Sequence, residues 1–159
     1  MTFKELSLQE KSSLDVTHQA VLTANDLTQA TVATAQSLNV AALPVGSIIA
    51  AVWLRLITPF QNPADAAFNS NSVDVGDTAL ATRFFTAQQL NANGAFISAP
   101  GYSATLGGPY AASQFLTANF NAMAAKALLS LKVGELHILV KIIDAKKLSD
   151  QQTPTPLTK

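Results

Sequence analysis

The chain has 159 residues, the usual size of a single domain, and only 13% of them are charged against a typical share of about 25%. Ten basic and ten acidic residues give a formal net charge of zero, which excludes a global field that would draw the protein onto nucleic acid or an anionic membrane. No cysteine is present, so disulfides, thiolate metal sites and cysteine nucleophiles are excluded as well.

The few charges are unevenly distributed along the chain. From Val16 to Ala125 the charged residues are Asp26, Arg55, Asp65, Asp74, Asp77 and Arg83, whereas Lys126 to Lys159 contains six lysines. Alanine, threonine, serine, asparagine and glutamine fill the middle of the chain, and such side chains are buried without the cost of desolvating an ion. We interpret this region as a surface that a partner covers. An ordinary polar, alanine-rich domain surface is the alternative.

The N-terminus, residues 1–15, is predicted to be an arm. It lacks the basic region and the long apolar stretch of a secretory signal. Thr2 to Leu8 reads as a strand that leaves the body of the protein and adds to the sheet edge of a neighbour. The alternative is an ordinary edge strand of the same domain.

Strands are predicted over Thr17–Thr23 and Gln29–Val40, with a turn at Asn25 and Asp26. The longest uncharged apolar run, Val40 to Leu54, is too short to span a bilayer, so no membrane span is expected. The clearest strand is Ser47–Thr58, which follows a turn signal and is rich in β-branched and aromatic residues. Both of its alternating faces are apolar, which predicts a central strand in a two-layer sandwich.

From Pro59 to Gln114 the sequence is punctuated by turn residues. Short strands are expected at Ser72–Val75 and Ala95–Ser98, and one or two helical turns within Ala79–Leu90. The signals recur too irregularly for a tandem repeat, so a single domain is expected.

The last strong signal is the strand Gly134–Asp144, in which apolar and polar residues alternate. Ala127–Val133 precedes it and predicts a β-hairpin, with a short helix over Ala118–Leu131 as the alternative because of its many alanines. Residues 149–159 read as a flexible tail. The predicted fold is an all-β, antiparallel, jelly-roll-like sandwich over residues 16–148 with long loops.

No reaction is indicated by the polar residues. Asp74 and Asp77, with Asp65 nearby, are the densest carboxylate cluster and could bind calcium or transfer protons, but Asp and Gly are also what tight turns require. His18 and His137 lack a partner at metal-ligand spacing. We therefore predict no catalytic, cofactor-binding or metal-binding residue, and a protein that is not an enzyme.

Candidate assembly residues come from the arm, from the aromatic residues of the loop region and from a charge on an apolar strand. Aromatic side chains are enriched at interface hot spots, although filling the core is the commoner use of phenylalanine. Arg55 must reach a strand end, a carboxylate or an interface, because an unpaired buried charge is costly. The candidates are Phe3, Leu6, Leu8, Arg55, Phe60, Phe68, Tyr102 and Tyr110.

The order of these features has a known counterpart. A Leu43-Pro-Val-Gly46 entry into a long strand that ends at Thr58-Pro-Phe60 is followed by Asn71–Asp77, Arg83-Phe84 and the strand Gly134–Asp144. From Val40 to Asp144 the chain thus resembles small β-sandwich structural proteins of tailed bacteriophages. The resemblance implies a capsid decoration (cement) protein on the virion surface, with the major capsid protein as partner and with self-association. It carries over no functional residues.

Other functions remain open at this point. A tail, baseplate or head-fibre subunit is the alternative within the virion. A carbohydrate-binding module would use Tyr102 and Tyr110 as stacking platforms, and an enzyme would use the carboxylates of Asp65, Asp74 and Asp77.

Overall fold

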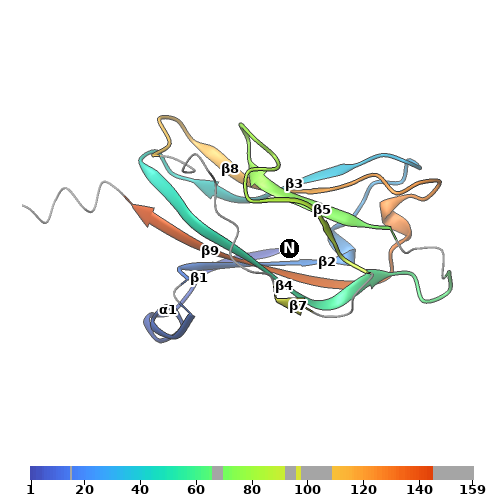
Figure 1. Cartoon of the computed structure of the whole chain (residues 1–159), viewed down its shortest axis with the longest axis horizontal. Helices are drawn as coiled ribbons and strands as arrows, with labels where there is room; N and C mark the ends of the chain where they lie inside the picture. Colours follow the sequence, from blue (N-terminus) through green and yellow to red (C-terminus); the bar gives the residue numbers. More distant parts are fainter. Residues whose placement is uncertain (15, 66–69, 92–95, 98–108, 145–159) are drawn as a thin grey trace, which may run out of the picture.

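Two antiparallel sheets pack face to face in the computed structural model, which describes residues 1–14, 16–65, 70–91, 96–97 and 109–144 (Figure 1). The five-stranded sheet contains, in spatial order, β1 (Thr2–Glu5), β2 (His18–Thr23), β9 (Val133–Asp144), β4 (Ser47–Gln61) and β7 (Phe96–Ile97). The four-stranded sheet contains β3 (Gln36–Leu43), β8 (Gln114–Phe120), β5 (Ser72–Asp77) and β6 (Phe85–Gln89). The predicted all-β sandwich is confirmed.

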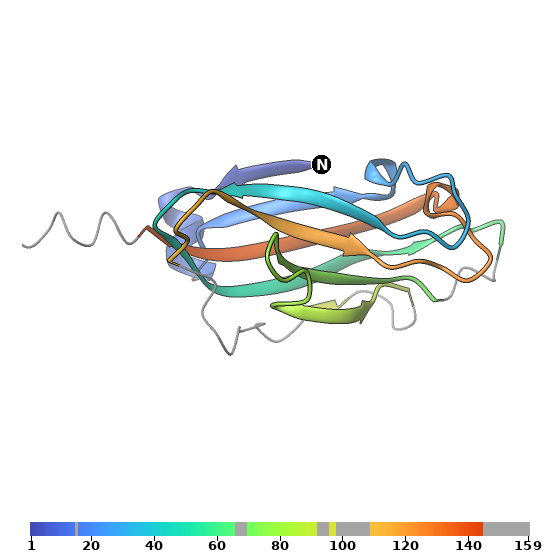
Figure 2. The same cartoon turned by 90° about the horizontal axis from the view of Figure 1, so that it is seen from above.

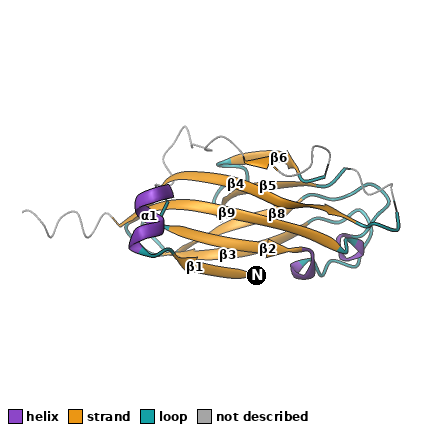
Figure 3. Ribbon diagram, turned by 90° about the horizontal axis from the view of Figure 1, so that it is seen from below, coloured by secondary structure: helices purple, strands orange, loops and turns teal. Residues whose placement is uncertain are grey.

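The strand order is that of a jelly roll. Leaving out β1, which extends one edge, the sheets read 2-9-4-7 and 3-8-5-6. Every neighbouring pair is antiparallel. Consecutive strands lie in different sheets, except for β1 with β2 and β5 with β6. Figure 2 shows the four-stranded sheet in front and Figure 3 the five-stranded sheet. Eight strands in two interlocked Greek keys define this architecture.

The two strands with the strongest sequence signal form the middle of the five-stranded sheet. β9 points Leu136, Ile138 and Val140 into the core, as its alternation predicts. β4 lies between β9 and β7, so the prediction of an interior strand is confirmed. The strict alternation predicted for β4 is wrong. A bulge between Ile49 and Ala51 inserts one residue, so the side chains after it point to the opposite faces from those predicted. Ile49 is followed on that face by Val52, Leu54 and Leu56.

The N-terminal segment forms an edge strand and a short helix. β1 pairs with β2 of the same chain, which is the second of the two alternatives. The helix α1 (Leu8–Leu14) follows and crosses one end of the five-stranded sheet (Figure 3). Ser7 and Glu10 form a capping box, in which each side chain binds the other residue's backbone N–H, at 3.3 and 2.9 Å. Leu6 anchors the segment through a buried side chain and a backbone hydrogen bond to Thr17.

Several local predictions are wrong. Ala127–Val133 forms no hairpin strand, since η2 (Leu128–Ser130) is a 3-10 turn and β9 pairs with β2 and β4 instead. The alternative helix over 118–131 is also wrong, because its first residues belong to β8. The interval 79–90 contains β6 rather than helical turns. The strand predicted at 29–40 begins later, at Gln36, and the turn at Asn25 and Asp26 is the 3-10 turn η1 (Ala24–Asp26).

The core lies between the sheets and contains most of the large apolar side chains. Within it, Phe60 near the end of β4 packs against Phe120 at the end of β8, with ring centroids 5.4 Å apart. Gly134 lies against the Phe60 ring, where an added Cβ would come within 2.4 Å of it. Among the described residues no helix is both long and apolar enough to cross a membrane.

Candidate assembly surface

The outer face of the four-stranded sheet presents small and neutral side chains. Its register sets Ser37 opposite Asn119, Asn39 opposite Thr117, and Ala42 opposite Phe115. Ser37, Asn39, Ala42 and Phe115 are exposed. Because side chains alternate between the faces of a strand, these residues point away from the core residues Leu43, Leu116 and Ala118. The face is therefore open to a partner.

One end of this face is apolar. The connection from β5 to β6 folds back over the sheet, so that a Cβ added at Gly76 would lie 2.0 Å from the Leu80 carbonyl oxygen. Phe115 is joined to this connection by two hydrogen bonds with Thr78, of 3.0 and 3.1 Å. Leu80 and Phe115 are 47% and 41% exposed, and Val45, in the turn between β3 and β4, is 41% exposed. We call the outer face together with this end the neutral face.

Charge distinguishes the neutral face from the opposite sheet. Within the described residues, the four-stranded sheet and its connections at 44–46, 78–84 and 109–113 contain three charged residues, Asp74, Asp77 and Arg83. Both carboxylates are buried, and the Arg83 side chain is only 14% exposed. The five-stranded sheet contains Lys4, Glu5, Arg55, Glu135, Lys141 and Asp144, none of them buried. The charge deficit of the sequence is thus concentrated on one face of the molecule.

Asp77 stabilises the conformation of the connection between β5 and β6 at the apolar end. Its Oδ1 accepts the backbone N–H groups of Ala79 and Leu80 at 3.0 and 2.8 Å. Its Oδ2 accepts Arg83 Nε at 2.6 Å and the Tyr110 hydroxyl at 3.0 Å. Burial alone would raise the pKa of this carboxyl, but the hydrogen bonds from Arg83, Leu80 and Tyr110 outweigh it and lower the pKa below its usual value. Burial and the Asp77 carboxylate raise the pKa of Tyr110.

The three carboxylates of the predicted cluster have separate roles. Asp74 accepts the backbone N–H of Ala87 at 2.6 Å, and Asp65 forms an ion pair with Lys126. Asp77 stabilises the turn after β5 through its hydrogen bonds to the backbone of that turn. This agrees with the interpretation of Asp77 as a turn residue rather than a calcium ligand. Among the described residues, no three His, Cys, Asp or Glu side chains converge to hold a metal ion.

The predicted assembly residues fall into different environments. Leu8 is 84% exposed on α1, and Arg55 is exposed on the outer face of the five-stranded sheet opposite His137. Phe3 is half-buried and stacks on His18, while Leu6 and Phe60 are buried within the chain. Tyr110 is 8% exposed and offers no open ring face for stacking on a sugar. Phe68 and Tyr102 lie outside the described residues.

Two exposed residues of the neutral face, Val45 and Leu80, are absent from the sequence-based candidates. The scarcity of charge between Val16 and Ala125 indicates the region, but it does not say which side chains turn outward. That information depends on strand register, which the sequence alone does not fix.

Comparison with known proteins bears on the fold. The sequence matches no known protein family and no curated protein. Among solved structures, a chain of the "Cyanophage Pam1 capsid asymmetric unit" is similar, with a TM-score of 0.55 and 22% sequence identity. The match covers 77% of this chain and 79% of the other. This likeness shows the fold. The sandwich described here therefore has a counterpart in a chain of a virus capsid.

Proposed function

We propose that the protein is a non-enzymatic structural component of a bacteriophage virion, a decoration protein that binds the assembled head and bridges neighbouring subunits. The observation that carries the proposal is the neutral face, where the residues exposed on the outer side of the four-stranded sheet and in the turns at its apolar end are uncharged. An interface core is depleted of charge and enriched in apolar and aromatic side chains. This face is likewise depleted of charge, and its apolar end exposes Val45, Leu80 and Phe115. The structural likeness to a chain of a cyanophage capsid supports the same assignment.

The neutral face is the surface proposed to contact the major capsid protein. Covering it buries no unpaired ion, since Asp74 and Asp77 are already buried and Arg83 is ion-paired with Asp77. Many copies on a fixed lattice engage at high effective concentration, so a modest contact per copy gives tight binding to the whole shell. This arrangement explains a chain with zero net charge, because its solubility matters less once it is assembled.

The N-terminal segment is proposed to link copies to one another. β1 is an edge strand with β2 on one side, and its other edge is open to strand addition within the described structure. The Leu8 side chain beside it is 84% exposed and is available to a neighbour. Self-association through this segment leaves the neutral face free for the shell.

The test is binding to heads of the virus that encodes this chain, prepared without the protein. We expect the full chain to co-sediment with assembled heads and not with unassembled capsid subunits. Deletion of residues 1–8 is expected to weaken binding, since it removes the link between copies. Failure of the full chain to bind heads would refute the proposal, and equal binding by the truncated chain would refute the role of the arm.

A tail, baseplate or head-fibre subunit is the alternative, and antibody labelling of intact virions separates it from a head protein by position. A gene beside the major capsid gene would support the head assignment.

A further inference from the structure

The two sheets end at different positions on the side where β1 lies. β1 extends the five-stranded sheet outside β2, whereas the described four-stranded sheet ends there at β3 (Figure 2). Met1 forms an ion pair with Asp26, and the Asp26 carbonyl oxygen accepts Gln36 Nε2 from β3 at 3.0 Å. At the other end of β1, Glu5 lines a cavity together with Ala42 of β3. β1 therefore runs alongside β3 and projects past the edge of the opposite sheet.

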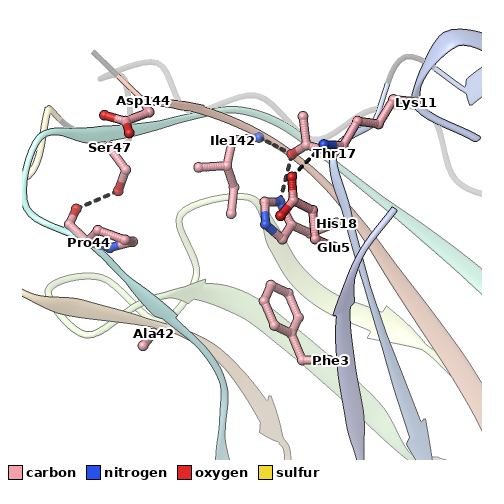
Figure 4. Close-up of a pocket in the computed structure, with 10 residues that line it drawn as sticks. All are labelled: Phe3, Glu5, Lys11, Thr17, His18, Ala42, Pro44, Ser47, Ile142 and Asp144. Carbon is pink, nitrogen blue, oxygen red and sulfur yellow. Dashed lines mark hydrogen bonds and ion pairs between the residues drawn. The ribbon is translucent and has the colours of Figure 1, made fainter. Parts of the chain in front are cut away.

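The core is incompletely covered beneath this projection. A cavity of about 380 Å³ opens where β1 faces the end of β3 (Figure 4). Figure 4 shows Phe3 and Glu5 on one side of it and Ala42 and Pro44 on the other. Phe3 and Leu38 both pack against the core but are only partly buried. The space beside β3 and beneath β1 thus borders on apolar side chains.

The hydrogen-bond pattern shows which backbone groups of β3 face its open edge. Just past β8, the Asn121 N–H donates to the carbonyl oxygen of Ser72 in β5 at 2.9 Å. Because successive residues of a strand direct these groups to alternate sides, the even-numbered residues of β8 face β3. Their partners in the register are Gln36, Leu38, Ala41 and Leu43. Ser37, Asn39 and Ala42 lie opposite odd-numbered residues, so their N–H and C=O groups point to the open edge.

This edge is suited to strand addition. In the described part of the chain, no hydrogen bond outside the β3–β8 ladder involves the backbone of Ser37, Asn39 or Ala42. β3 contains neither a charged residue nor a proline, two features that protect exposed edges from pairing with another chain. Its pairing is interrupted once, by the bulge between Asn39 and Ala41. The backbone of β3 is therefore available to a further strand.

We propose that the open edge of β3 takes up one extended strand from a subunit of the virus shell, which enlarges the four-stranded sheet beneath β1. The occupant is a polypeptide, because strand addition needs a backbone with alternating donors and acceptors. Its inward side chains pack against Phe3 and Leu38, and its outward side chains continue the neutral face beside Ser37 and Asn39. An uncharged segment with apolar residues at every second position fits these surroundings. That the strand comes from a shell rests on the proposed function.

The projecting β1 disfavours a second copy of this chain as the occupant. β2 lies behind β3 in Figure 2, and β1 lies one strand further out. Two copies joined edge to edge through β3 would each place β1 where β2 of the partner copy lies. A single strand from a terminal arm or a loop avoids this overlap, because it needs only the space beneath β1.

The test is amide hydrogen exchange of the full chain, free and bound to heads of the virus that encodes it. In the free chain we expect the Ser37, Asn39 and Ala42 amides to exchange faster than those of Leu38 and Ala41, which are bonded to β8. On heads we expect the three outward amides to slow by about tenfold or more. β6 is the control, because it is the other edge of the same sheet and should be unchanged.

A matched pair of variants tests the same edge by affinity. Ser37→Pro removes an N–H that faces the open edge and leaves the β3–β8 hydrogen bonds in place, whereas Ser37→Ala keeps that N–H. We expect Ser37→Pro to bind heads at least about fivefold more weakly, the effect of one net hydrogen bond, and Ser37→Ala to bind like the unmodified chain. Unfolding curves check that both variants are folded, and the exchange measurement on the unmodified chain does not depend on them.

The outcomes separate this proposal from the proposed function. Head binding with unchanged exchange at Ser37, Asn39 and Ala42 would overturn the strand addition and leave the proposed function standing. Failure of the unmodified chain to bind heads would refute the proposed function and the shell as the source of the strand. Slowed exchange of these amides in a concentrated solution of the chain alone would identify a second copy as the occupant, and would also overturn the shell strand.

Discussion

Replacement of Asp77 by Asn tests whether the ion pair and hydrogen bonds of Asp77 stabilise the apolar end of the neutral face. An Asn side chain retains one carbonyl oxygen for the backbone N–H groups of Ala79 and Leu80, but its NH₂ group faces Arg83 Nε as donor against donor. Removing one partner of a buried ion pair costs about 3–5 kcal/mol, and we expect the lower end because Arg83 is partly exposed. A loss of about 3 kcal/mol corresponds to a fall in Tm of roughly 6–12 °C for a chain of this size.

The assay is equilibrium urea unfolding at pH 7 together with a thermal melt. Asp74→Asn is the matched control, because its retained oxygen still accepts the Ala87 N–H, and we expect a change below about 1 kcal/mol. The double mutant with Arg83→Met isolates the pair, since most of the Asp77→Asn effect should vanish once Arg83 is absent. A change under about 0.5 kcal/mol for Asp77→Asn, or full additivity with Arg83→Met, would refute the reasoning.

The pH dependence of the free energy of unfolding also tests the role of the Asp77 carboxylate. The pKa of Asp77 is lowered on folding, so its stabilisation is complete above the unfolded pKa near 3.9 and is lost as the pH falls below that value. The Asp77→Asn variant is expected to lose part of this acid slope in a plot of unfolding free energy against pH. A slope identical to that of the unmodified chain would contradict the assignment.

Three further predictions concern other parts of the fold. Gly76→Ala places a Cβ 2.0 Å from the Leu80 carbonyl oxygen, so we expect urea titration to show a loss of about 1–3 kcal/mol in the free energy of unfolding. An unchanged free energy of unfolding would show that the 78–84 connection moves to make room for the methyl group. Burial lowers the pKa of His18 on folding, so the free energy of unfolding is expected to decrease as the pH falls below the ordinary histidine pKa near 6.5. The His18→Phe variant should lack this decrease in thermal melts between pH 7.5 and 5. Deleting residues 1–8 removes the buried Leu6 and the Phe3–His18 stack, so we expect a lower Tm with the far-UV β signal retained, whereas an unchanged Tm would mean that the segment packs weakly on its own chain.

Sequence patterns predict the long strands and not the short ones. β4 and β9 are evident because each contains ten or more residues with many β-branched side chains. β8 contains no run of that kind, and the alanines that follow it favour a helix in isolation, so its strand conformation depends on pairing with β3 and β5. α1 does carry a signal, since Ser7 and Glu10 have the spacing of a capping box, but its polar residues obscure it.

The candidate surface is only partly encoded in such patterns. Scarce charge predicts a region to be covered, but a single bulge at Ile49 and Ala51 reverses which residues of β4 face outward. Phe60 and Tyr110, named as assembly candidates from their residue type, are buried within this chain. Leu80 and Phe115 are brought together by the fold of the 78–84 connection, which no local pattern specifies.

The central claim is that the neutral face contacts the shell, and a matched pair of variants tests it most directly. Leu80 and Leu129 are each 47% exposed, but Leu80 lies on the neutral face and Leu129 in the connection between β8 and β9. The measurement is the affinity of Leu80→Asp and Leu129→Asp for assembled heads, after unfolding curves confirm that both are folded. We predict that Leu80→Asp loses head binding while Leu129→Asp binds like the unmodified chain. Retained binding by Leu80→Asp, or equal loss in both variants, would contradict the account.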